Sequence, residues 1–111
     1  MNYEKLSDTL KSIADPNRLQ IIELLSCGGL KACEILEFFN FSQPTLSYHM
    51  KVLCSEDLVH KSKEGRWIFY TLNEDKIAEI DSHLHQIFTK DKDHCLCDPI
   101  IKQRKKEKSN D

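Results

Sequence analysis

Two cysteines near the carboxyl-terminal end of the sequence, Cys95 and Cys97, have the type and spacing of ligands for a soft ion. Side chains two residues apart in an extended segment point to the same side, so both thiols can turn toward one bound atom. Thiolates are soft donors and select soft acceptors. The alternative is a pair of exposed thiols without a ligand. A purely structural role in a core is not expected, because the segment is polar and follows the last apolar helix.

A second group of side chains could form hydrogen bonds with nucleic acid. Residues 42–54 are expected to form a helix, because Ser42 can cap its amino end and Pro44 suits its first turn. Leu46, Met50 and Leu53 recur at i, i+4 and i+7 and give this helix one buried stripe. An ordinary amphipathic surface helix could look the same. The side chains outside the stripe, however, are of the types that bond base edges and phosphates in a major groove. They are Ser42, Gln43, Thr45, Ser47, Tyr48, His49 and Lys51.

The segment after this helix predicts a β-hairpin with a basic tip. Two β-rich runs, 58–63 and 66–72, flank Glu64-Gly65, which we expect to form the turn. Lys61, Lys63 and Arg66 lie close to this turn. We expect Lys63 and Arg66 to contact the DNA backbone or the minor groove beside a helix that binds the major groove.

Several separated motifs resemble the ArsR/SmtB winged helix-turn-helix repressors. They are Ala14-Asp15-Pro16-Asn17-Arg18-Leu19, Phe41-Ser42-Gln43-Pro44-Thr45-Leu46-Ser47, His49, and Gly65-Arg66 followed by Tyr70-Thr71-Leu72. The resemblance covers residues 3 to 97, and arsenic-responsive ArsR proteins are the most similar. It implies an α+β, mostly helical fold with five helices and a β-hairpin wing. It also implies a DNA-binding repressor that acts on double-stranded operator DNA.

The spacing of apolar residues predicts the other elements and a dimer. Helices are expected over 3–13, 16–26 and 31–39, and a last helix is expected from residue 74 onward. The first and last helices each carry a narrow apolar seam that a lone domain of this size would leave exposed. Pairing with a second copy would bury both seams, and the resemblance likewise implies a homodimer through these helices. We expect one winged-helix domain over 1–98 and a basic, disordered tail over 99–111.

The resemblance also suggests a third thiol ligand, Cys33. The segment Lys31-Ala32-Cys33-Glu34-Ile35-Leu36 resembles the Cys-x-Cys-Asp-Leu segment of arsenic-sensing ArsR proteins, but Lys31 stands where the first cysteine would be. Cys33, Cys95 and Cys97 together would supply three thiolates, the number that a pyramidal As(III) or Sb(III) centre favours. The alternative is that Cys33 is a small core residue. Cys27 and Cys54 are expected to pack rather than bind.

A rival metal site would lie on and after the last helix. Asp81, His83, His94 and Cys97 resemble the Asp-x-His-x10-His-x2-(Glu/His) pattern of SmtB-like sensors of zinc, cobalt and nickel. These ligand types suit a tetrahedral divalent ion such as Zn(II) or Cd(II). The register differs, however, because Asp81 comes eleven residues after Tyr70, about two helical turns later than in those relatives.

Composition limits the remaining alternatives. Residues 1–98 carry 11 Lys and Arg against 16 Asp and Glu, so a DNA-binding face must be a local basic patch on an acidic body. The sequence has no signal-peptide pattern or membrane-length apolar run, and we expect a cytoplasmic protein without a membrane partner. No nucleotide-binding or catalytic motif is present, so we expect neither an enzyme nor an obligatory cofactor. A small DNA-binding protein with no metal effector remains the alternative to a sensor.

Overall fold

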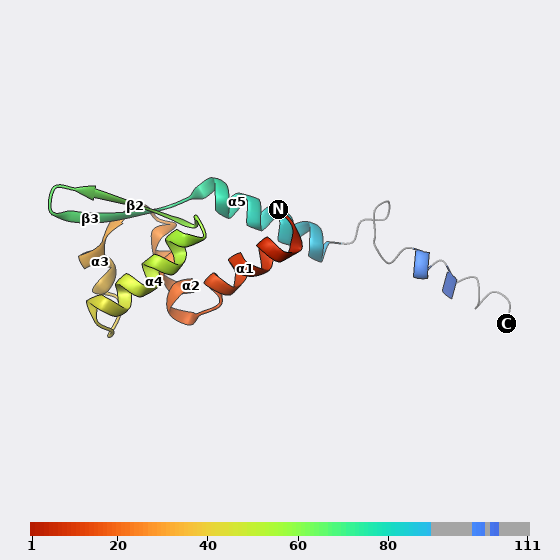
Figure 1. The fold of residues 1–111 in the computed structure, drawn as a ribbon, viewed down its shortest axis with the longest axis horizontal. Coiled ribbons are helices and arrows are strands. Elements are labelled where there is room, and N and C mark those ends of the chain that lie inside the picture. Colours follow the sequence, from red (N-terminus) through yellow and green to blue (C-terminus); the bar gives the residue numbers. More distant parts are fainter. Residues whose placement is uncertain (90–98, 102, 105–111) are drawn as a thin grey trace. The chain divides into compact units, whose positions relative to one another are not determined.

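The computed structural model describes residues 1–89, 99–101 and 103–104 of the 111-residue chain. The chain forms two compact units, Met1–Ile80 and Asp81–Asp111, and each is described by itself. Figure 1 shows the order of the elements along the chain. Residues 99–101 and 103–104 are helical. The disordered tail expected over 99–111 stays a prediction. The domain boundary at residue 98 adjoins residues outside this description and stays a prediction.

The first two helices begin where the sequence places a polar cap. In α1 (Tyr3–Ile13), the Asn2 side chain accepts a hydrogen bond of 2.8 Å from the Lys5 N–H. In α2 (Pro16–Leu25), the carboxylate of Asp15 accepts from the N–H groups of Asn17 and Arg18 at 2.9 and 3.1 Å. Each cap satisfies backbone donors that have no partner within the helix.

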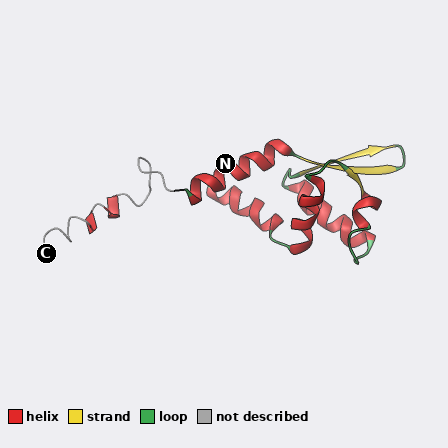
Figure 2. Ribbon diagram, turned by 180° about the vertical axis from the view of Figure 1, so that it is seen from behind, coloured by secondary structure: helices red, strands yellow, loops and turns green. Residues whose placement is uncertain are grey.

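A short third strand accompanies the predicted hairpin. The strands β1 (Leu30–Lys31), β2 (Val59–Glu64) and β3 (Trp67–Leu72) form an antiparallel sheet in the order β1-β3-β2. Figure 2 shows the hairpin as an arm that extends along one side of the helices of the first unit. Glu64 still pairs with Trp67, so the turn is centred on Gly65-Arg66 rather than on the predicted Glu64-Gly65. Gly65 has φ 61°, a conformation that glycine adopts without steric cost.

The helix-turn-helix consists of α3 (Ala32–Leu36) and α4 (Gln43–Ser55). The third helix is shorter than the predicted 31–39, because Lys31 belongs to β1 and residues 37 and 38 form a turn. The rings of Phe39 and Phe41 stack 4.5 Å apart in the connection to α4. The predicted stripe of α4 is buried, together with side chains from α2, α3 and the start of the hairpin. These core residues are Ile21, Leu25, Ile35, Leu46, Met50, Leu53, Leu58 and Val59.

The last helix, α5 (Glu74–Phe88), begins in the first unit and ends in the second. Glu74 and Asp75 lie in its first turn, where carboxylates interact favourably with the helix dipole. Ile80 is buried and fixes the start of the helix on the first unit. Over the described ranges, no helix has the length and apolar character needed to cross a membrane.

The cap of α2 predicts a pH-dependent contribution to stability. The hydrogen bond from the Arg18 N–H, more than any other interaction, holds the pKa of Asp15 below its usual value of 3.8, and the Arg18 charge adds to this against partial desolvation. A lowered pKa in the folded state stabilises the fold above the unfolded-state pKa, and this gain is lost as the pH falls through the folded-state pKa. Asp15→Ala should therefore lower the free energy of unfolding at pH 7 by about 1 kcal/mol.

Urea unfolding at pH 7 and pH 3 measures this contribution. We expect the difference between wild type and Asp15→Ala to shrink at pH 3. Asp15→Asn is the matched control, since it keeps a capping oxygen without the charge and should be the less destabilising change at pH 7. A difference that is the same at both pH values would contradict the role of the Asp15 charge.

Candidate nucleic-acid interface

The exposed face of α4 carries most of the predicted base-contacting side chains. Gln43, Ser47, Tyr48 and Lys51 are exposed, and Tyr48 retains 61% of its accessible surface. Behind them, the apolar stripe holds the helix on the core. The arrangement separates an apolar inner face from an outer face of amide, hydroxyl and ammonium groups. Such a helix can enter a major groove and form hydrogen bonds with base edges.

Ser42 and Thr45 lie at the amino end of α4 and already have partners. The Ser42 hydroxyl accepts from the Thr45 N–H at 3.4 Å and lies 3.2 Å from the Thr45 hydroxyl. Ser42 is exposed, whereas Thr45 is half-buried. Their first role is therefore to start the helix.

The prediction that His49 faces outward is wrong. His49 is 7% exposed, and its Nδ1 lies 3.0 Å from Arg18 Nη1. The ring of Phe41 lies 5.5 Å from the His49 ring, centroid to centroid. The reason is positional, because His49 follows Leu46 by three residues and precedes Leu53 by four, which puts it on the apolar face. The same spacing rule that identified the stripe could have identified His49.

Arg18 is a positioning residue that the sequence patterns did not identify. Its Nε donates to the Ser12 carbonyl at 2.5 Å, and its Nη1 contacts His49, so one guanidinium joins α1, α2 and α4. Thr9 provides a second link, since its hydroxyl lies 3.3 Å from the carboxylate of Glu56 at the end of α4. These two contacts fix the direction in which α4 presents its outer face.

The hairpin tip is basic, as predicted. Lys63 and Arg66 are exposed, and the Arg66 guanidinium carbon lies 4.7 Å from the centroid of the Trp67 ring. Lys31, which was not predicted to belong to this surface, places its Nζ 4.8 Å from the same centroid. Trp67 therefore has a cation from each of two segments against it.

A groove of about 600 Å³ lies between α4 and the hairpin. Lys51 and Lys61 contribute to its lining, and no carboxylate does. Cys54 and Tyr70 also line it, and burial raises the pKa of both groups. The raised pKa keeps the Cys54 thiol protonated, which disfavours it as a metal ligand because thiolates are the binding form. The groove thus joins the polar face of α4 to the basic hairpin as one positively charged surface.

Of the three predicted thiol ligands, Cys33 lies in the part of the chain that the structure describes. Cys33 lies on α3 and is exposed, so the alternative that it is a core residue is wrong. Cys27 is exposed as well, which contradicts the expectation that it packs, whereas Cys54 is half-buried. Cys95 and Cys97 fall outside the described residues. In the described part of the chain, no group of three or more His, Cys, Asp or Glu residues could hold a metal ion.

The structure also describes only two of the four ligands predicted for the rival divalent metal site. Asp81 is exposed and His83 is half-buried, and both lie on α5 in the second unit. His94 and Cys97, the other two predicted ligands, fall outside the described residues. Both metal sites therefore stay predictions.

Comparisons with known proteins identify the family of the chain. The model of the bacterial regulatory protein arsR family matches residues 15–61, which run from the cap of α2 into β2. The arsenical resistance operon repressor of Staphylococcus xylosus is 48% identical over 97 residues, which cover 87% of this chain and 92% of that repressor.

Two solved structures share the fold. A possible transcriptional regulator for arsenical resistance is 26% identical, with a TM-score of 0.69 over 75% of this chain and 86% of that chain. HlyU from Vibrio cholerae is 33% identical, with a TM-score of 0.64 over 79% of this chain and 98% of that chain. The chain therefore belongs to the arsR family of bacterial regulatory proteins, which are DNA-binding transcriptional regulators with a winged helix-turn-helix fold.

Proposed function

We propose that this protein is a homodimeric repressor that binds its own operator and leaves it when a soft, thiophilic ion loads. The observation that carries the DNA-binding part is the exposed polar face of α4 beside a basic hairpin, on a chain whose body is acidic. An acidic body limits nonspecific attraction to DNA, so binding depends on this local surface.

Each side chain of the surface has a role that follows from its chemistry. The Gln43 amide can bond an adenine edge with two hydrogen bonds, and Ser47 and Tyr48 offer hydroxyls to bases or phosphates. Lys51, Lys63 and Arg66 supply the charge that holds the backbone. Ser42 and Thr45 hold the first turn of α4 in place through their mutual hydrogen bonds. His49 is assigned to the support of α4 and not to base contacts.

The dimer would use the apolar surfaces of the two terminal helices. Tyr3 on α1 is 65% exposed, and a groove along α1 is lined by Tyr3, Leu6, Leu10 and Ala14 among others. In the second unit, Ile87 and Phe88 on α5 are 45% and 80% exposed. Exposed apolar side chains of this size are typical of a protein interface. Two copies would place their α4 helices in successive major grooves, roughly 34 Å apart, on a near-palindromic site.

We further propose As(III) or Sb(III) as the inducer, with Cys33, Cys95 and Cys97 as the three thiolate ligands. The names of the staphylococcal relatives support a metalloid signal, and Cys33 is exposed and available. A bound ion would supply the attraction that draws the three thiolates together. Release then requires only that the ion bind the off-DNA conformation better, by about 1–3 kcal/mol of coupling. A divalent ion at Asp81, His83, His94 and Cys97 is the alternative, and a repressor without a metal effector is the third.

The first prediction separates base recognition from backbone attraction. Gln43→Ala should relax the sequence preference, at a cost of about 1–3 kcal/mol for the operator if the amide makes a bidentate contact. Arg66→Ala should weaken binding to all sequences alike and reduce the salt dependence. Fluorescence anisotropy with operator and scrambled duplexes at several salt concentrations measures both effects. If both variants bind the operator as wild type does, the proposed DNA-binding surface is wrong.

The second prediction concerns assembly. Leu84 lies in the apolar seam of α5, four residues after Ile80 and three before Ile87. Leu84→Glu should produce monomers with much weaker operator binding, because a charge placed in this seam is costly to bury without a partner. Sedimentation velocity at micromolar concentration measures the assembly, and Asp81→Glu on the same helix is a control that leaves the charge unchanged. If Leu84→Glu is still a dimer, the interface lies elsewhere. If wild type is itself a monomer, the proposed dimer is wrong.

The third prediction concerns the inducer. Cys95→Ser combined with Cys97→Ser should abolish operator release by As(III) while leaving DNA binding without the ion unchanged, since serine keeps the size but not the affinity for soft ions. His83→Ala and His94→Ala should change the response little. Operator release titrated in parallel with As(III), Sb(III), Cd(II), Zn(II) and Cu(I) measures these responses.

Other outcomes of this titration favour the alternatives. Histidine variants that lose a Zn(II) response, with cysteine variants that keep it, would favour the divalent site on α5. A wild-type repressor that no ion releases would favour the interpretation without a metal effector.

A further inference from the structure

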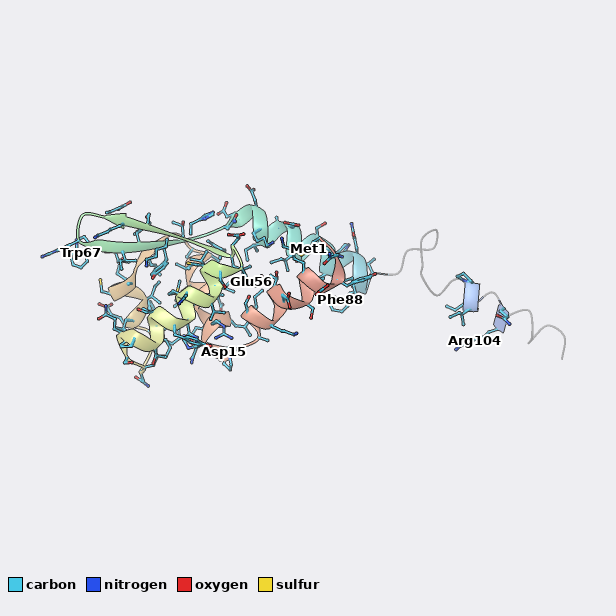
Figure 3. The ribbon with its side chains drawn as sticks, in the orientation of Figure 1. Met1, Asp15, Glu56, Trp67, Phe88 and Arg104 are labelled. Carbon is cyan, nitrogen blue, oxygen red and sulfur yellow. The ribbon has the colours of Figure 1, made fainter. Side chains whose placement is uncertain are left out.

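Trp67 is a large aromatic side chain that lies outside the core of the protein, with two cations against its ring. It begins β3 directly after the turn, and Figure 3 shows it at the free end of the hairpin. Its ring is 40% exposed, yet two cations lie against it, Lys31 at 4.8 Å and Arg66 at 4.7 Å from the centroid. Both distances are within the range of a cation–π contact.

The backbone holds Lys31 in this place. Lys31 pairs with Phe69 across the β1–β3 ladder, which makes Trp67, two residues earlier, its diagonal neighbour on the same face. The Lys31 N–H also donates to the Glu34 carboxylate at 2.8 Å at the start of α3. The backbone of Lys31 is therefore held in position, and from there its ammonium group reaches the Trp67 ring.

The ring brings two like charges to one point on the surface. Cations repel one another at short range, and the electron-rich face of an indole offsets part of that repulsion. Lys63 adds a third charge near the same tip, on the other face of the hairpin, because it pairs with Ile68. Glu64, opposite Trp67 in register, and Glu34, which accepts from the Lys31 N–H, supply two carboxylates. The tip thus keeps a net positive charge on an acidic protein, and a polyanion is the partner that such a site favours.

We propose that Lys31, Trp67 and Arg66 form one phosphate-binding unit at the hairpin tip, with Trp67 as the residue that positions both cations on the DNA backbone. Lys31 is then a further DNA-binding residue, although it lies outside both α4 and the hairpin. This inference rests on the proposed function, because it concerns the same DNA. It adds a contact from the first half of the helix-turn-helix to the contacts of the hairpin.

Trp67 is the only tryptophan in the chain, so its fluorescence reports on the tip directly. Operator duplex titrated into wild-type protein should change the intensity or wavelength of the emission in step with binding measured by anisotropy of a labelled duplex. An emission that stays constant while anisotropy reaches saturation would overturn the inference.

Variants test the separate roles of the two residues. Lys31→Gln should weaken binding to operator and scrambled duplexes alike, and should lower the salt slope by about 0.9, the value for one phosphate contact. Trp67→Leu should weaken binding by roughly two- to fivefold, the scale of an exposed cation–π contact, and Trp67→Phe should restore part of that loss. Lys5→Gln, which removes the same charge from an exposed lysine on α1, is the control and should change neither quantity.

The outcomes distinguish this inference from the proposed function. A wild-type protein that binds no DNA contradicts the proposed function itself. The inference alone is overturned if wild type binds DNA and Gln43→Ala changes the sequence preference, but Lys31→Gln has the same salt slope as the control Lys5→Gln. If Trp67→Leu fails to fold, Lys31→Gln and the wild-type fluorescence still decide.

Discussion

The position of α4 depends on the partly buried contact between Arg18 and His49. A guanidinium can only donate hydrogen bonds, so in this 3.0 Å contact Arg18 is the donor and His49 Nδ1 the acceptor. The same guanidinium donates to the Ser12 carbonyl at the end of α1. One side chain thus contacts three helices and fixes their spacing. The outer face of α4 can present Gln43 and Ser47 to DNA because its inner face is fixed in this way.

The charged side chains are also distributed unevenly between the body of the protein and its proposed DNA-binding surface. The chain has 18 acidic and 16 basic side chains, so its net charge gives no general attraction to DNA. Lys51 and Lys61 line the groove beside α4, and Lys31, Lys63 and Arg66 surround the hairpin tip. Attraction concentrated in local patches favours the approach of a polyanion at those patches, which a uniformly charged surface would not do.

Local patterns predicted most of the fold and only part of the site. Caps, apolar spacing and turn residues act over three or four positions, and they were sufficient for α1, α2, α4, α5 and the hairpin. They could not predict β1, because Leu30 and Lys31 are only two residues and their strand exists through pairing with Tyr70 and Phe69. The contact of Arg18 with His49, 31 residues later, has the same non-local origin. His49 itself was within reach of the pattern, since it falls on the face of Leu46 and Leu53.

The strand that the sequence did not predict connects the two parts of the surface. β1 ends at Lys31, α3 begins at the next residue, and the exposed Cys33 follows within its first turn. The Lys31 backbone is held by pairing with Phe69 on the hairpin and by the Glu34 carboxylate, so a force on this turn acts on β3 as well. Under the proposed function, an ion that draws Cys33 toward other thiolates would pull on the segment that aligns the hairpin tip with α4. Lys31 stands where arsenic-sensing relatives have their first cysteine, and it cannot bind the ion. Because its side chain contacts Trp67 instead, it would connect ion binding at Cys33 to the hairpin.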